Sequence, residues 1–256
     1  MPKSQTKTIT VATYNIHKGL SHFNRRVILS EVREGLRETK ADIVFLQEVQ
    51  GARHRAKRAH ANHPQGHGVA QHDFLGAGGF GEVVYGQNAT YELGHHGNAV
   101  MSRFPVLDWE NIDVSHHVLE SRGLLHCRVQ VPGWAPLHCI CVHLGLWARS
   151  RTFQLARLCE LIEAHVPHSE PLIIAGDFND WRRKASKFLA RELDVHEAFE
   201  EVGGSPARTY PASMPMLSLD RIYVRRLKVK SVECLNEGTW AKLSDHAALM
   251  AVLAPA

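Results

Sequence analysis

The amino-acid sequence predicts an α/β protein in which two packed β-sheets are flanked by helices. Short runs of β-branched and apolar residues recur along the whole chain, and such runs are typical of buried strands. Between some of them lie longer segments in which apolar residues recur at helical spacing. No stretch rich in proline, glycine and serine separates two comparable groups of these runs. The 256 residues are therefore expected to form one domain, 1–256.

The expected strands and helices can be placed in order along the chain. Strand character is found at 8–16, 41–49, 98–104, 124–131, 137–144, 171–178, 219–224, 229–235 and 248–253. Helical spacing is found over 24–38 and 151–165. Residues 1–8 are expected to form a flexible tail. The stretch 51–81 is expected to be a long loop region, of the kind that carries function or moves.

The composition is that of an ordinary globular protein and excludes several classes. Hydrophobic residues make up 44% of the chain and charged residues 22%, which argues against disorder and fibrous repeats. No run approaches the roughly 20 apolar residues that span a bilayer, and the polar N-terminus is unlike a signal peptide, so a cytoplasmic location is expected. The five cysteines include no CxxC pair and are interpreted as reduced thiols. A net charge of +4 suits an anionic substrate but does not by itself indicate nucleic acid.

Polar side chains follow the expected strands at the points where those strands end. The segments are TYNIHKG, FLQEV, CVHLGL, GDFND, LDRIYV and SDHAAL. A rigid sheet fixes strand-end residues in place, which is why α/β proteins build their sites there. Each residue alone has an ordinary explanation, such as a turn for Asn15 or a packed core position for His143. Taken together, the segments supply the candidate site residues Asn15, Glu48, His143, Asp177, Asn179, Asp220, Asp245 and His246.

These motifs resemble those of the endonuclease/exonuclease/phosphatase superfamily, which includes DNase I-like nucleases, bacterial sphingomyelinases and inositol-polyphosphate phosphatases. The resemblance extends from Asn15 to His246, and GDFN combined with a late SDH is highly specific. The opening NIHKG, followed by NRR, is similar to a group of small bacterial members. The resemblance implies a DNase I-like, four-layered sandwich of two mixed sheets with helices outside. It also implies metal-dependent hydrolysis of a phosphate ester.

The resemblance implies a magnesium ion and its ligands. Glu48 would be the principal ligand, with Asn15 and Asp245 nearby in the metal site. Magnesium prefers oxygen ligands and keeps several waters, so carboxylates and an amide suffice, and no cysteine lies in any of these motifs. Manganese is the expected substitute.

The resemblance also implies the catalytic roles. Asp177 and Asn179 would position and activate the attacking water, because a carboxylate accepts a proton and an amide orients the water without competing for it. Asp220 would hold His246 in one orientation and favour its charged form, which then donates to a phosphate oxygen. His143 would contact the phosphate from the opposite side. Five of the residues are expected to converge on one pocket: Glu48, Asp177, Asn179, Asp245 and His246.

Further residues are candidates for contacts with the substrate. Arg122 and Asn98 stand where related enzymes place substrate-facing residues, and a guanidinium is well shaped to bind phosphate. An ordinary packing role remains open for both. Rim positions or positions near the metal are open for His17, Lys18, Trp147, Arg149, Arg151 and Trp181.

Three functions from different classes remain open. The first is a phosphodiesterase or phosphatase acting on a small molecule or lipid head group, the second is a nuclease acting on DNA or RNA, and the third is a non-catalytic binding module. The first is favoured over the second because no device for handling duplex DNA is recognisable. A basic run is either a solvated loop or a contact to an anionic membrane or nucleic acid: Arg53, Arg55, Lys57 and Arg58. No obligate protein partner is inferred.

Overall fold

The structure is a computed structural model that describes residues 7–21, 27–51, 69–91, 94–117 and 120–256. Its strands form two six-stranded sheets. In spatial order, the first sheet consists of β11 (Leu227–Leu235), β12 (Ala248–Pro255), β1 (Ile9–Asn15), β2 (Ile43–Gln50), β4 (Gly94–Ser102) and β3 (Glu82–Tyr91). The second consists of β5 (Val106–Asp113), β6 (Gly123–Val129), β7 (Leu137–His143), β8 (Leu172–Asp177), β10 (Asp220–Arg225) and β9 (His196–Glu197). Both sheets are mixed, because β1 with β2 and β7 with β8 are parallel pairs whereas the other pairs are antiparallel.

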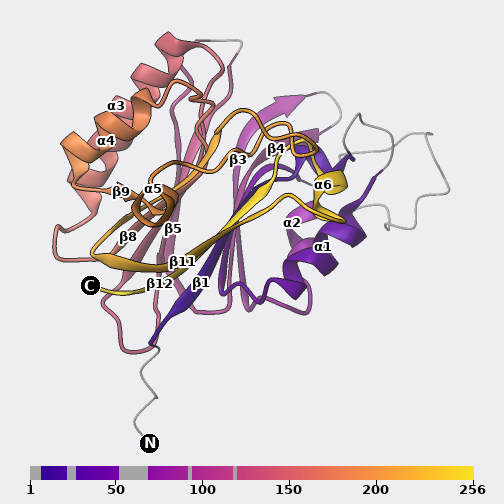
Figure 1. Cartoon of the computed structure of the whole chain (residues 1–256), viewed down its shortest axis with the longest axis horizontal. Helices are drawn as coiled ribbons and strands as arrows, with labels where there is room; N and C mark the ends of the chain where they lie inside the picture. Colours follow the sequence, from indigo (N-terminus) through magenta and orange to yellow (C-terminus); the bar gives the residue numbers. More distant parts are fainter. Residues whose placement is uncertain (1–6, 22–26, 52–68, 92–93, 118–119) are drawn as a thin grey trace, which may run out of the picture.

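Helices cover the outer face of each sheet (Figure 1). The first sheet is covered by α1 (Leu29–Glu38), α2 (Gln71–Gly76) and α6 (Trp240–Leu243). The second is covered by α3 (Ala148–His165) and α4 (Lys184–Leu193). The remaining helices are α5 (Ala198–Gly203) and the 3₁₀ turn η1 (His17–Gly19). These layers confirm the four-layered sandwich. No helix in the described ranges is long and apolar enough to cross a membrane.

The alternation of side chains along each strand builds the layers. In β1, Ile9 and Val11 belong to the core between the two sheets. Ala12 and Tyr14 of the same strand belong to the core under α1. Successive side chains of a strand point to opposite faces, so one apolar strand contributes to both cores. This explains why the strand runs are apolar at nearly every position.

The structure also contains elements that the sequence did not predict. Each of the nine expected strand runs contains a strand, but the strands β3, β5 and β9 and the helices α4, α5 and α6 were missed. The predicted helix 24–38 begins at Leu29, with 22–26 outside the described residues, and the predicted helix 151–165 begins at Ala148. The expected loop 51–81 contains α2, while 52–68 lie outside the described residues. Strand β5 lies at a sheet edge, and its polar residues neither alternate regularly with the apolar ones nor leave a continuous apolar run, so its sequence signal is weak.

Candidate active site

The candidate site lies where strands of both sheets end. Parallel pairing of β7 with β8 places His143 opposite Asp177. Antiparallel pairing of β8 with β10 places Asp177 opposite Asp220, the first residue of β10. In the other sheet, parallel pairing of β1 with β2 places Asn15 opposite Gln47. Residues far apart in the sequence therefore meet at one end of the sandwich because strand register puts them there.

Gly176, in the GDFN motif, allows β8 to carry Asp177 close to β7. Its φ is +146°, and a Cβ on it would lie 1.9 Å from the backbone oxygen of Val142. Neither the backbone conformation nor the space admits a side chain. The glycine of the motif is therefore a packing requirement of the site and takes no part in its chemistry.

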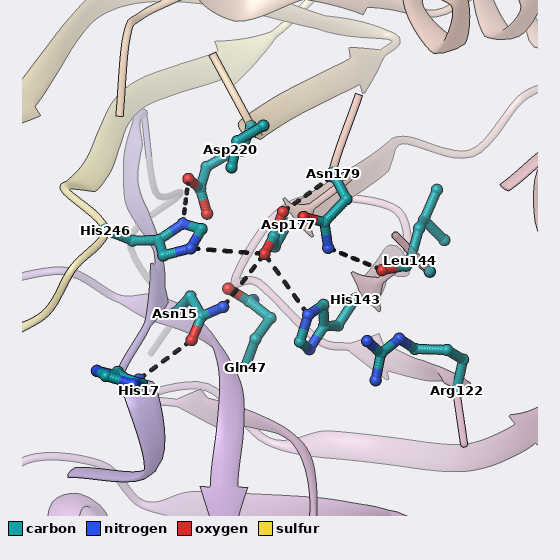
Figure 2. Close-up of polar contacts among 12 residues, drawn as sticks. Asn15, His17, Gln47, Arg122, His143, Leu144, Asp177, Asn179, Asp220 and His246 are labelled. Carbon is teal, nitrogen blue, oxygen red and sulfur yellow. Dashed lines mark hydrogen bonds and ion pairs between the residues drawn. The ribbon is translucent and has the colours of Figure 1, made fainter. Parts of the chain in front are cut away.

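The Asp177 carboxylate lies at the centre of the candidate site (Figure 2). Its Oδ2 accepts a hydrogen bond of 3.2 Å from the side-chain amide of Asn15. The same oxygen lies 3.5 Å from Nε2 of His143 and 3.8 Å from Nε2 of His246. Its Oδ1 accepts a 2.9 Å bond from the backbone N–H of Asn179. One carboxylate thus joins residues from β1, β7 and the loops after β8 and before β12.

Burial gives Asp177 unusual basicity for a carboxylate. The side chain is 1% exposed, and loss of water raises its pKa to about 7. The neighbouring Asp220 adds to the rise, whereas His246 and the N–H of Asn179 oppose it. A carboxylate with this pKa is able to accept a proton near neutral pH.

Asp220 and His246 form a buried acid–histidine pair. Nδ1 of His246 donates to Oδ2 of Asp220 at 2.9 Å. Burial alone lowers the pKa of the imidazole, but the charges of Asp220 and Asp177 outweigh burial and raise it to about 10. The hydroxyl of Thr209 accepts a 3.3 Å bond from the Asp220 N–H, and the Tyr210 ring lies 5.1 Å from the imidazole. His246 is therefore a fixed cation at neutral pH.

His143 differs from His246 in charge. Its ring is buried, and burial is the main reason that its pKa falls well below 6.5. The positive charges of Arg122 and His246 lower the pKa further, and Figure 2 shows Arg122 beside His143. His143 therefore faces the site as a neutral imidazole, which can still donate one N–H. It is not a second cationic donor.

Asn15 and Asp245 lie together on the side of the site that belongs to the first sheet. The hydroxyl of Ser244 donates 2.7 Å to the backbone oxygen of Asn15, and it lies 3.3 Å from Oδ1 of Asp245. The backbone N–H of His17 donates to Oδ1 of Asn15 at 3.1 Å. The imidazole Nδ1 of His17 lies 3.6 Å from the Asp245 carboxylate. The side-chain oxygens of Asn15 and Asp245 thus both contact His17, just after the end of β1.

Glu48 occupies a strained backbone position in β2, the strand that pairs with β1. It follows Gln47, the register partner of Asn15, and has a φ of +58° at an irregularity in the pairing of β2 with β4. A non-glycine residue in the left-handed region costs about 1 to 3 kcal/mol, and such strain clusters at functional sites. Within the described ranges, the half-buried Glu48 carboxylate forms no hydrogen bond or ion pair. Its oxygens are available to an external cation.

The candidate site offers donors that suit a metal ion. Ligand atoms of Asp177, Asp220 and His246 lie within 4.8 Å of one another. The Nδ1 of His246 is bonded to Asp220, whereas Oδ1 of Asp220 is buried without a partner. Hard oxygen donors in this number suit a divalent cation that keeps part of its water shell.

Comparison with known proteins identifies the family. The sequence model of the Endonuclease/Exonuclease/phosphatase family matches residues 12–246. The chain belongs to this family. The endonuclease/exonuclease/phosphatase assignment makes it a phosphoester hydrolase, as the sequence predicted, and the two stacked mixed sheets have the family's architecture.

The chain is similar to proteins from bacteria and from an animal. The chain is 46% identical over 252 residues to a protein of Escherichia coli named Uncharacterized protein YbhP, with 97% of both chains covered. An endonuclease/exonuclease/phosphatase from Bacteroides vulgatus superposes with a TM-score of 0.76 at 17% identity, covering 98% of this chain and 100% of that one. D. rerio TDP2 complexed with single-strand DNA product gives a TM-score of 0.71 at 18% identity, covering 97% and 99%. At these identities the two structures show the shared fold.

The two residues predicted to contact the substrate, Arg122 and Asn98, have different surroundings in the structure. Arg122 is half-buried beside His143, with its Nε buried and unpaired, and so retains hydrogen-bonding capacity. Asn98 is 1% exposed, and its amide donates to the backbone oxygens of Gly123 at 3.0 Å and Cys141 at 3.4 Å. These bonds cross from the first sheet to the second. The geometry therefore gives Asn98 a bracing position between the sheets, with only its buried Oδ1 unpaired.

Several residues of the site were missed by reasoning from the sequence. Ser244 stands within the quoted SDHAAL segment, so a signal for it was present. Thr209 and Tyr210 lie in the long segment between α5 and β10 and carry no local motif. Gln47 precedes Glu48 and donates to Thr13 at 3.2 Å and to the Cys141 sulfur at 3.3 Å. These contacts depend on how distant segments pack in the folded protein, so the sequence alone does not reveal them. The basic run 53–58 lies outside the described residues.

Proposed function

We propose that the protein is a magnesium-dependent phosphodiesterase that acts on a small or lipid-linked phosphodiester. The observation that carries the proposal is the set of side chains around Oδ2 of Asp177, which lies 3.2 Å from Asn15 and 3.8 Å from the His246 cation. This arrangement combines a buried proton acceptor with a buried cationic donor. Hydrolysis of a phosphate ester requires both, one for the attacking water and one for the charge on phosphorus-bound oxygens.

The residues at the ends of β1 and β2 fit a magnesium ion. Glu48 and Asp245 supply carboxylates, Asn15 supplies an amide oxygen, and the Glu48 carboxylate has no partner within the described ranges. Oxygen donors of this kind match magnesium and also manganese, whereas thiolates would indicate zinc. When bound, the ion polarises a phosphoryl oxygen and offsets the negative charge that grows there.

Asp177 and Asn179 are proposed to handle the attacking water. The raised pKa of Asp177, about 7, lets its carboxylate take the proton of a water that attacks phosphorus. The Asn179 side chain donates 2.9 Å to the backbone oxygen of Leu144, and its φ of +50° fixes its orientation at the strand end. Its amide oxygen then orients the water and does not compete for the proton.

His246, Asp220 and Arg122 are proposed to bind the phosphate. The His246 cation donates from Nε2 to a nonbridging oxygen, because Nδ1 is held by Asp220. Arg122 approaches from the side of His143 and provides a second positive charge. The neutral His143 donates an N–H from that same side. Positive charge is thus available from two sides of Asp177, from His246 on one and from Arg122, beside His143, on the other.

A nuclease is the second candidate function. The observation that favours it is the fold shared with D. rerio TDP2, whose structure holds a single-strand DNA product, although the identity is 18%. The small-molecule or lipid substrate is preferred because the net charge of +4 is modest for a protein that must neutralise many phosphates. A non-catalytic binding module is least favoured, since every catalytic position is filled. A cytoplasmic location is part of this proposal.

A substrate screen tests the proposal. Purified protein, with magnesium or manganese and with a chelator as the control, is incubated with bis(p-nitrophenyl) phosphate, phospholipid vesicles, plasmid DNA and RNA. The expected result is metal-dependent release of nitrophenol and of lipid head groups. Nicking of plasmid at nuclease rates without action on vesicles would replace the proposal by the nuclease. Absence of hydrolysis of every substrate despite bound metal would favour the binding module.

A further inference from the structure

Large apolar side chains are exposed around the candidate site. Three segments beside it carry them: one directly after His143, one directly after Asp180 and one shortly before Asp220. All three meet the end of the second sheet where the catalytic residues lie, because β7 and β8 end there and β10 begins there. We name these side chains the apolar rim: Leu146, Trp147, Trp181, Met214, Met216 and Leu217.

Side chains of α3 hydrogen-bond to the backbone of the first segment of the apolar rim. The guanidinium of Arg151 donates to the backbone oxygens of Gly145 at 3.1 Å and Leu146 at 2.6 Å. Gln154 accepts a 2.8 Å bond from the Gly145 N–H. On this fixed loop, Leu146 is 64% exposed and Trp147 is 70% exposed. An apolar side chain of this size gains nothing from water, so a braced loop that presents two of them indicates a contact surface.

Arg151 also joins the first segment to the second. Its guanidinium lies 5.1 Å from the ring centre of Trp181. The Trp181 side chain remains 46% exposed, so one part of the indole is covered by the cation and the rest faces solvent. One buried arginine therefore contacts both tryptophan-bearing loops.

The third segment borders the opposite side of the site. The N–H of Ala212 donates to the backbone oxygen of Asp245 at 2.8 Å, and the N–H of Met216 donates to that of Tyr210 at 2.9 Å. Tyr210 in turn packs on His246. Met214 is 63% exposed and Met216 is 58% exposed on this tied loop. The apolar rim thus has parts on both the metal side and the water side of the site.

The exposed charges within the segments of the apolar rim have one sign. Segments 144–153, 181–187 and 211–217 contain no aspartate or glutamate, and Asp180, directly before Trp181, is buried. The first two segments carry exposed cations at Arg149, Arg182, Arg183 and Lys184. Tryptophan, leucine and methionine next to arginine and lysine form the combination that binds the interfacial region of an anionic membrane.

We propose that the apolar rim and its cations dock the site onto an anionic lipid surface, where the phosphodiester of a lipid head group is hydrolysed. The proposal rests on the proposed phosphodiesterase function and names where the substrate resides. Leucine and methionine side chains bury into acyl chains, whereas a single-stranded nucleic acid needs planar faces on which bases stack. Only two of the six rim residues are aromatic, and Arg151 already lies over one of them. The chemistry of the rim therefore favours lipid.

A binding experiment tests the docking separately from hydrolysis. The Asp177→Asn protein, in which catalysis is expected to fail, is sedimented with vesicles of phosphatidylglycerol mixed with phosphatidylcholine, and with vesicles of phosphatidylcholine alone. Adding Trp147→Ser, Met214→Ser and Met216→Ser is expected to weaken binding to the anionic vesicles about tenfold, because apolar area no longer enters the interface. Trp109→Ser removes a side chain that is 53% exposed on the edge strand β5, and it is the matched control.

Hydrolysis by active protein then separates the two proposals. The three rim substitutions in the native background are expected to lower turnover of phosphatidylglycerol vesicles and to leave turnover of bis(p-nitrophenyl) phosphate unchanged. Equal vesicle binding with and without the rim substitutions overturns the docking surface. If the rim substitutions weaken binding to a single-stranded oligonucleotide but not binding to vesicles, the docking surface is also overturned. A nucleic acid is then favoured as the binding partner. If wild-type protein binds vesicles but hydrolyses no phosphodiester, the docking surface stands and the proposed function fails.

Discussion

The side-chain amide of Asn15, in the first sheet, donates a 3.2 Å hydrogen bond to the carboxylate of Asp177, in the second. Two further polar contacts cross between the sheets nearby: Gln47 to the sulfur of Cys141 and Asn98 to the backbone oxygen of Gly123. A buried polar group must find a partner, so these bonds fix how the sheets sit on each other. The metal side and the water side of the site are therefore aligned by the packing of the sheets.

Asp177→Asn is expected to lower turnover of a phosphodiester by about 10² to 10⁴, the range typical of a lost general base. An amide keeps the shape of the carboxylate but takes up no proton at neutral pH. Steady-state kinetics on bis(p-nitrophenyl) phosphate measure the loss. Asp194→Asn, at the end of α4, is the matched control and retains full activity. Half of wild-type turnover in the Asp177 variant would refute its role as base.

Glu48→Gln is expected to weaken magnesium affinity by more than about tenfold, the smallest loss that outer-sphere partners of metal ligands commonly show. The substitution removes the charge of a carboxylate that has no other partner in the described part of the chain. Activity titrated against magnesium, and calorimetry with manganese, measure the change. Part of the activity should return at saturating metal. Glu82→Gln, exposed on β3, is the control. An unchanged titration would move the metal site elsewhere.

Asp220→Asn is expected to shift the alkaline limb of kcat/KM to lower pH. The Asp220 carboxylate helps to raise the pKa of His246 from 6.5 to about 10, so the wild-type imidazole keeps its proton until the pH passes that value. Without this charge the proton is lost earlier, and the donor to phosphate disappears as the pH rises. The defect should therefore be smallest at acid pH and grow toward alkaline pH. A defect of constant size across the pH range would contradict this role.

The wild-type protein is expected to lose stability as the pH rises from about 4.5 to about 7, because of Glu197. Glu197→Gln is expected to remove this loss. Burial raises the pKa of Glu197 from 4.5 to about 7, so the folded protein holds this proton over a range in which the unfolded chain has released it. Stability from this group is full below the unfolded pKa and is lost as the pH rises through the folded one. The difference is on the order of 3 kcal/mol, since one pKa unit is about 1.4 kcal/mol. Urea unfolding of both proteins at pH 5 and pH 8 measures it.

Sequence patterns predicted the buried strands well and the half-exposed elements poorly. Strands such as 171–178 are apolar on both faces because helices lie on one side and a second sheet on the other, and this produces a continuous signal. Strand β3 contains Gly86, Asn88 and other polar residues, since it lies at a sheet edge. Helix α4 begins at Lys184, and its N-cap residue Arg183 is not one of the usual capping residues. The Ala185 N–H instead donates to the Asp180 carboxylate of the GDFND segment at 2.6 Å.

The site residues were accessible from sequence only as a set of motifs. GDFND and SDHAAL name Asp177 and His246, but nothing in either segment shows that Asp177 Oδ2 lies within 3.8 Å of His246. The charge of His143 was equally hidden, because it depends on Arg122 and on burial by other strands. Long-range packing decides both. The exposure of Met214 and Met216, which underlies the lipid proposal, has no sequence signal at all.

The bond between Asn15 and Asp177 also joins residues that are synthesised far apart in time, since 162 positions separate them in the chain. Translation delivers Asn15 early, Asp177 much later and His246 after that, just before the strand β12, which pairs with β1. A chain that ends before β12 therefore lacks His246, the neighbour that Asp177 Oδ2 has at 3.8 Å. The side chains around Asp177 come together only when the first and the last strands of the chain are paired in one sheet.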